Sequence, residues 1–258
     1  LMDITSLPGQ LIDNLLNNLH IVAIFVGFYL FVYLAGRRVV RFGLSKDKID
    51  DLSYWIGFAA VVGGRVVYIL PEAEVYVDNP YNLILVNTGM NLYGAIGGAL
   101  IVGIWKAKRL GLELGPTLDL YAVYLPAGLL VARFGCVLGN SCFGEATTGP
   151  FGVVFPGLTQ ARFPSELYEG LFVLLLFGVL MVLSTRRLPA GLLFLAFLTA
   201  YPIGRTLVDF TRIDLGGGMS DVALPFSLLL SSVAAAMVFV HMNGGLERLM
   251  VRVRRRPS

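Results

Sequence analysis

Three arginines, Arg65, Arg133 and Arg205, lie inside stretches of the chain that are otherwise apolar enough to cross a membrane. An arginine near the bilayer centre costs about 2.5–3.5 kcal/mol on insertion scales, so each is expected to serve a purpose. A guanidinium group binds phosphate well because its rigid fork donates two parallel hydrogen bonds. Three arginines on three separate segments therefore predict a shared cationic site for an anionic ligand.

Each arginine also has a simpler interpretation. An arginine near the end of a membrane helix can extend its side chain to the interface, and Arg205 could pair with Asp209 one helical turn away. Glycines flank the arginines at Gly63, Gly64, Gly135 and Gly204. Glycine allows a ligand or another helix to approach the backbone closely. The three arginines together with these glycines therefore favour a shared site over three arginines that each extend to the interface or pair locally.

The composition is that of a membrane protein. Hydrophobic residues make up 56% of the 258 residues and charged residues only 14%, whereas soluble domains carry about 25% charged residues. The net charge of +3 is too small to indicate nucleic-acid binding, and the spacing of Cys136 and Cys142 does not fit a zinc site. We expect a single integral membrane domain over residues 1–258, monomeric and without metal, cofactor or nucleic acid.

Apolar stretches of about 20 residues, the length that crosses a bilayer as a helix, predict an all-α fold. The seven predicted transmembrane helices cover residues 20–36, 52–70, 89–107, 117–139, 165–185, 189–211 and 222–243. The loops on one face are 71–88, 140–164 and 212–221. Loop 140–164 is rich in glycine, threonine and proline and is expected to form a small outer-face cap. Tyrosines near helix ends are expected at the membrane interfaces, namely Tyr121, Tyr124, Tyr168 and Tyr201.

Basic residues give the orientation, because cytoplasmic loops carry an excess of lysine and arginine. Of the 20 basic residues, 15 lie in the segments that follow the first, third, fifth and seventh predicted helices. These segments are expected inside, with the N-terminus outside and the C-terminus cytoplasmic. The second, fourth and sixth helices then run outward. This brings Arg65, Arg133, Arg205 and Asp209 to the level of the outer headgroups, with Arg212 at the mouth of the sixth helix.

The segment Ala132–Gly149, ARFGCVLGNSCFGEATTG, resembles the signature of the prolipoprotein diacylglyceryl transferase family. The residues that match this signature are Arg133, Gly135, Gly144 and Thr147. Four other segments occur in the family's order: GGRVVYIL from Gly63, GMNLYGAIGG from Gly89, RFPSELYEG from Arg162 and YPIGRTLVDFTR from Tyr201. The resemblance therefore covers nearly the whole chain.

The resemblance implies a multi-pass enzyme of the bacterial cytoplasmic (inner) membrane. Such an enzyme moves diacylglyceryl from phosphatidylglycerol, a membrane lipid, to a cysteine thiol of an exported lipoprotein precursor, and releases glycerol phosphate. Arg133 and Arg205 are expected to stabilise the phosphate during catalysis. The residues expected to bind the substrates are Arg65, Arg212, Asp209, Glu169, Asn140, Gly135, Gly144 and Tyr168.

The sequence departs from the family pattern where proton chemistry is expected. Cys136 stands at the position of the signature's first asparagine, and Tyr93 and Phe163 stand where the family has histidines. Tyr93 is therefore a candidate for the proton acceptor or for an orienting hydrogen-bond donor. The other candidates for the base are His20, Glu169 and Asp209, and the arginines alone could also stabilise an incoming thiolate.

These departures leave two other functions open. One is a related membrane lipid transferase that uses a different acceptor, such as an amine, a hydroxyl or another thiol. The other is a non-catalytic protein that binds or transports phospholipid. The arginines and the PSELYE run, which begins at Pro164, favour catalysis, whereas the missing histidines and asparagine favour the alternatives.

Overall fold

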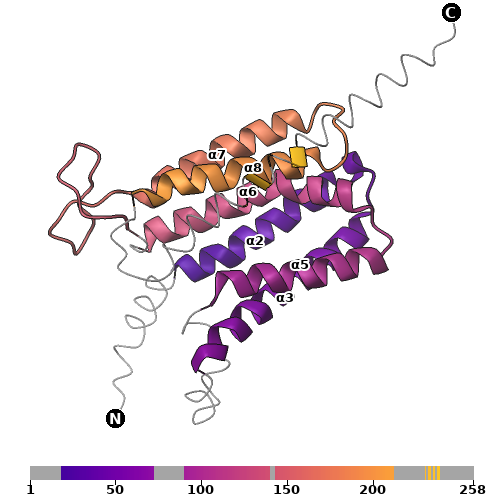
Figure 1. Ribbon diagram of the computed structural model, residues 1–258, viewed down its shortest axis with the longest axis horizontal. Helices are drawn as coiled ribbons and strands as arrows, with labels where there is room; N and C mark the ends of the chain where they lie inside the picture. Colours follow the sequence, from indigo (N-terminus) through magenta and orange to yellow (C-terminus); the bar gives the residue numbers. More distant parts are fainter. Residues whose placement is uncertain are drawn as a thin grey trace, which may run out of the picture. The chain divides into compact units, whose positions relative to one another are not determined.

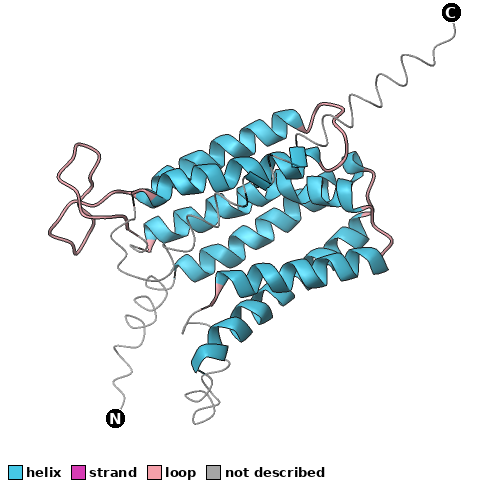
Figure 2. Ribbon diagram, in the orientation of Figure 1, coloured by secondary structure: helices cyan, strands magenta, loops and turns pink. Residues whose placement is uncertain are grey.

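The computed structural model describes residues 19–72, 90–139 and 143–211, with six more residues between 230 and 238. These parts of the chain are mainly helical (Figures 1 and 2). The long helices are α2 (Leu19–Arg38), α3 (Lys46–Ile69), α5 (Leu92–Arg109), α6 (Leu114–Leu138), α7 (Ser165–Leu183) and α8 (Leu192–Asp209). Two short 3-10 helices, η2 (Val39–Phe42) and η3 (Leu70–Glu72), follow α2 and α3.

Five of the described helices are long and apolar enough to cross a membrane. They cover Leu19–Phe42, Lys46–Ile69, Leu114–Leu138, Ser165–Leu183 and Leu192–Asp209. Helix α5 is not among them, because three of its 18 residues are the basic Lys106, Lys108 and Arg109. The prediction of an α-helical membrane protein is therefore confirmed. The seventh predicted helix, 222–243, lies largely outside the described residues.

Two helix boundaries differ from the predicted ones because polar residues decide them. Helix α3 begins at Lys46, well before residue 52, and its polar first turns include the ion pair of Lys46 with Asp50. Hydropathy detects only the apolar part of such a helix. Helix α5 begins after Asn91, whose side chain accepts a hydrogen bond from the Gly94 amide at 3.0 Å. This cap satisfies a backbone donor that the helix leaves unpaired.

The chain divides into two compact units. The smaller unit, Val32–Leu120, contains α3 and α5, which pack against each other in opposite directions. A Cβ atom on Gly63 would meet the backbone of Gly94, and one on Gly98 would meet the backbone of Ala59. Glycine thus lets the two backbones touch. Beside Arg65, the close approach anticipated from the sequence is made by a neighbouring helix.

The larger unit, Leu1–Phe31 with Tyr121–Ser258, contains the first part of α2, most of α6, and α7 and α8. These helices lie side by side (Figure 1). Helix α2 contacts α6 where a Cβ atom on Gly135 would meet Ala23, and α8 contacts α7 where one on Gly204 would meet the ring of Phe172. The glycines next to Arg133 and Arg205 therefore also serve helix packing.

The loop between α6 and α7 folds back on itself and appears as the two-lobed loop in Figure 2. Val153 and Arg162 exchange two backbone hydrogen bonds of 2.9 Å. The Glu145 amide donates to the Thr211 carbonyl at the end of α8, also at 2.9 Å. The segment predicted to form the cap is thus attached to the same end of the larger unit at which α6 ends, α7 begins and α8 ends.

Candidate active site

A cluster of charged side chains joins α6, α7 and α8 at this end of the larger unit. Arg133 on α6 donates from Nη1 to Glu166 Oε2 at 3.2 Å and from Nη2 to Glu169 Oε1 at 2.8 Å. Arg205 on α8 donates from Nη1 to Glu169 Oε2, and its Nη2 forms an ion pair with Asp209 Oδ1 at 3.0 Å. Glu169 therefore bridges the two arginines that the sequence singles out.

Helical spacing explains why these side chains meet. Glu166 and Glu169 are three residues apart in α7 and leave the helix on one face, as do Arg205 and Asp209, four residues apart in α8. Glu166 also lies in the first turn of α7, where the positive end of the helix dipole stabilises an anion. Arg133, near the end of α6, then reaches both glutamates.

The carboxylates of the cluster are more deeply buried than the arginines. The Glu169 side chain is fully buried and that of Glu166 is 4% exposed, whereas the side chains of Arg133 and Arg205 are 22% and 24% exposed. Burying a carboxylate is costly unless it is paired and hydrogen-bonded, and both glutamates are paired here. Each arginine thus allows carboxylates to stay buried in an apolar helix bundle.

Among the described residues, the cluster contains more carboxylates than guanidinium groups. Two guanidinium groups face three carboxylates, so these five side chains carry one negative charge in excess when all are ionised. The arginines are visible in the sequence as exceptions in apolar stretches, whereas glutamates at a helix start are not. Arg212, a further arginine of the predicted site, lies outside the described residues.

Several buried polar atoms of this region have no hydrogen-bond partner within the described ranges. They are Arg133 Nε, Thr206 Oγ1 and Asp209 Oδ2. Buried polar atoms in proteins are nearly always paired, with protein or with ordered water, so each of these atoms is available to a water molecule or a ligand. Arg133 Nε is a donor, and a phosphate oxygen is an acceptor that would satisfy it.

Tyr201, which the sequence predicts at a membrane interface, contacts the cluster. It is one turn before Arg205 inside α8, and its hydroxyl donates to Glu169 Oε1 at 3.2 Å. Its ring stacks on Phe197 with 5.4 Å between the ring centroids. Tyr124, also predicted at an interface, is 2% exposed. Position along a helix does not reveal which face a tyrosine occupies.

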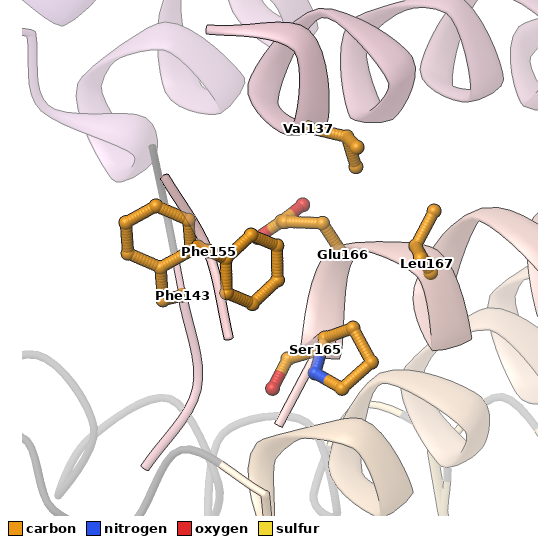
Figure 3. A pocket seen from close by; sticks show the side chains of 7 residues that line it. Val137, Phe143, Phe155, Ser165, Glu166 and Leu167 are labelled. Carbon is orange, nitrogen blue, oxygen red and sulfur yellow. The ribbon is translucent and has the colours of Figure 1, made fainter. Parts of the chain in front are cut away.

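Glu166 is a further member of the cluster, and its spacing of three residues from Glu169 in the PSELYE run is the sequence signal for it. Glu166 also lines a small pocket, partly open to solvent, between the end of α6, the loop and the start of α7 (Figure 3). The other residues that line this pocket are Val137, Phe143, Phe155, Pro164, Ser165 and Leu167.

Two predicted substrate-binding residues hold the loop in place. Gly144 donates its amide hydrogen to the Phe163 carbonyl at 2.9 Å, and a Cβ atom there would meet Ser165. The Tyr168 hydroxyl donates to the Phe151 carbonyl at 3.1 Å. Both residues therefore connect the loop to the start of α7, next to Glu166 and Glu169.

The remaining predicted residues are not part of this described cluster. Arg65 and Tyr93 belong to the smaller unit, on α3 and in the first turn of α5. His20 lies in the first turn of α2, and its Nδ1 is another buried atom without a partner in the described part of the chain. Asn140 and Arg212 lie outside the described residues. The roles assigned to these residues remain predictions from the sequence.

Comparison with known proteins gives a consistent result over this region. A family model, that of prolipoprotein diacylglyceryl transferase, matches residues 18–242, which include every residue of the cluster. The phosphatidylglycerol–prolipoprotein diacylglyceryl transferase of Geobacter sulfurreducens is 30% identical over 214 residues, 81% of each chain. The protein of the same name from Pseudoalteromonas atlantica is 31% identical over 89% of this chain and 83% of its own. That from Bordetella avium is 33% identical over 74% and 78%, respectively.

Proposed function

Because this chain belongs to the prolipoprotein diacylglyceryl transferase family, we propose that it transfers diacylglyceryl from phosphatidylglycerol to the cysteine thiol of an exported lipoprotein precursor. The observation that carries this proposal is the buried cluster in which Glu169 bridges Arg133 and Arg205. Ionisable residues within membrane segments are rare and mark functional sites. A cluster at the end of three such helices lies where a lipid headgroup can reach it.

The cluster suits the charge that develops in this reaction. When the bond between the glyceryl carbon and the phosphate oxygen breaks, glycerol phosphate leaves with one more negative charge than the phosphodiester had. Arg133 and Arg205 stabilise that charge most effectively in a site of low dielectric constant. Glu169 and Asp209 hold the two guanidinium groups in fixed positions, so little reorganisation is needed when the charge appears.

The proposed orientation places the cluster at the outer face of the bacterial cytoplasmic membrane. In this orientation, the protein is one integral domain with seven spans, its N-terminus outside and its C-terminus inside. The distribution of basic residues supports it. Arg186 and Arg187 come just after α7, at the opposite end from Glu166. The end of α7 would then face the cytoplasm, and the loop 143–164 would face the exported precursor.

Topology reporters test this orientation. A reporter that is active only outside the cytoplasm should be inactive when fused after Ser184 and active when inserted at Gly157. The reciprocal pattern is expected for a reporter that is active only inside. An outside reporter that is active after Ser184 would overturn both the orientation and the outer location of the cluster.

Complementation tests the function. In a bacterium depleted of its own diacylglyceryl transferase, expression of this chain should restore growth and add the mass of one diacylglyceryl group to the lipoprotein cysteine. The same chain carrying Arg205→Ala is the inactive control. Lipid added to an amine or a hydroxyl instead would establish the related transferase. Phospholipid binding without transfer to any acceptor would establish the binding protein.

A further inference from the structure

The pocket beside the charged cluster is apolar along most of its lining. Val137 of α6, Leu167 of α7 and the rings of Phe143 and Phe155, whose centroids lie 4.4 Å apart, supply apolar surface. Figure 3 shows the carboxylate of Glu166 pointing from the start of α7 into the space beside Phe155. An apolar pocket with a small number of polar groups is the usual form of a ligand site.

Glu166 is the carboxylate of the cluster that lines this pocket. Glu169 is fully buried and gives both oxygens to the two arginines, and Asp209 pairs with Arg205 on α8. The hydroxyl of Ser165, which also lines the pocket, lies 2.6 Å from the hydroxyl of Thr211. Among the described residues that line the pocket, Glu166 is therefore the group placed to take a proton.

We propose that Glu166 is a catalytic residue that accepts the proton of the acceptor thiol, and that the pocket admits the acceptor cysteine. This inference rests on the transferase function proposed above. A cysteine thiol has a pKa of about 8.5 and must lose its proton to become the nucleophile. Tyr93 and Phe163 occupy the histidine positions of the family pattern, so a residue other than a histidine at these positions must take the proton.

The proposed step is balanced in atoms and charge. The S–H bond breaks and the proton moves to a carboxylate oxygen of Glu166. The sulfur electron pair forms the C–S bond to the glyceryl carbon, while the C–O bond breaks and its electron pair stays on the phosphate oxygen. The proton then passes from Glu166 to the departing glycerol phosphate, which restores the carboxylate. The thiol hydrogen thus ends on the phosphate, and no other reactant is consumed.

Arg133 connects proton uptake by Glu166 with the charge that develops on the phosphate. Its Nη1 donates to Glu166 Oε2 at 3.2 Å, so protonation of Glu166 weakens that ion pair and releases the guanidinium donor. The five charged side chains change from an excess of one negative charge to neutrality as the phosphate gains charge. Proton uptake by Glu166 thus removes one negative charge beside the phosphate as the phosphate gains one.

The test uses the full-length protein with phosphatidylglycerol and two otherwise identical acceptor peptides, one with cysteine and one with selenocysteine. A selenol is a stronger acid than a thiol and is already ionised at pH 7. Glu166→Gln should lower transfer to the thiol by about 10²–10⁴-fold, the usual worth of acid–base help. It should lower transfer to the selenol less than severalfold. Glu113→Gln, the same change at an exposed residue just before α6, should leave both rates unchanged.

Other outcomes would reject the proposal. An equal loss on thiol and selenol would show that Glu166 only holds Arg133 in place, and an unchanged thiol rate would exclude Glu166 from the reaction. If Tyr93→Phe, rather than Glu166→Gln, lowered transfer to the thiol but not to the selenol, Tyr93 would be the base. Glu166→Asp keeps the carboxylate and should retain more thiol activity than the glutamine variant. A wild-type protein that transfers to neither peptide would overturn the transferase function itself.

Discussion

Replacing Arg133 or Arg205 with alanine is expected to lower the rate of diacylglyceryl transfer by about 10²–10³-fold or more. Each arginine contributes a guanidinium group that is held by two carboxylates and faces the developing phosphate charge. Its loss removes transition-state stabilisation and also takes one ion-pair partner away from each of two carboxylates. The measurement is the transfer rate to a cysteine peptide at saturating phosphatidylglycerol, together with the thermal stability of each variant in detergent.

Lysine variants separate these two effects. Arg133→Lys keeps the positive charge, so the protein should fold, but an ammonium group cannot reproduce the fork that reaches Glu166 and Glu169 together. Transfer by the lysine variant should therefore stay far below the wild-type rate. Arg186→Ala is the matched control, because Arg186 is exposed beyond the other end of α7. Near-normal transfer by Arg133→Ala would mean that this arginine only reaches toward the interface.

The fold could be predicted well from hydropathy because a bilayer imposes one length and one polarity on every crossing segment. The predicted helix 165–185 is α7, Ser165–Leu183, almost to the residue. Hydropathy could not predict where a helix continues beyond the apolar region. Helix α3 begins at Lys46 because its first turns are stabilised by polar contacts, including that between Lys106 and Asp51 at 2.9 Å.

The candidate site could be predicted in part. The pair of Arg205 with Asp209 follows from spacing along one helix, so it is visible in the sequence. The contacts of Arg133 with Glu166 and Glu169 join two helices, and they depend on how α6 packs against α7. No local pattern encodes that packing. For the same reason, the contact of Tyr201 on α8 with Glu169 on α7 is not visible in the sequence.

The glycines beside the arginines show a further limit of local patterns. Glycine permits close approach, but the sequence does not tell whether a ligand or a helix makes that approach. At Gly135 the neighbour is Ala23, and at Gly204 it is Phe172. These glycines bring the helices close enough for side chains of limited length to meet. Their contribution to the candidate site is therefore to allow the helix spacing in which the ion pairs form.

Glu169→Ala is expected to destabilise the protein by about 3–5 kcal/mol, the cost of removing one partner from a buried ion pair. Glu169 is fully buried and is the shared partner of Arg133 and Arg205. Its loss leaves two guanidinium groups without their common carboxylate, so transfer should be lost as well. The free energy of unfolding in detergent measures the first effect, and the peptide assay measures the second.

A double-mutant cycle shows whether Glu169 acts as a bridge. If it does, Arg205→Ala should cost less stability in the Glu169→Ala background than in the wild type, because Arg205 has already lost its buried partner. The coupling free energy should lie at about 0.5–3 kcal/mol, the range for residues in contact. Glu169→Ala combined with Arg186→Ala should be additive to about 0.5 kcal/mol, since Arg186 lies beyond the other end of α7. Additivity in both cycles would mean that the contact between Glu169 and Arg205 contributes nothing to stability. The cluster could then not be the preorganised phosphate site that the proposed transfer requires.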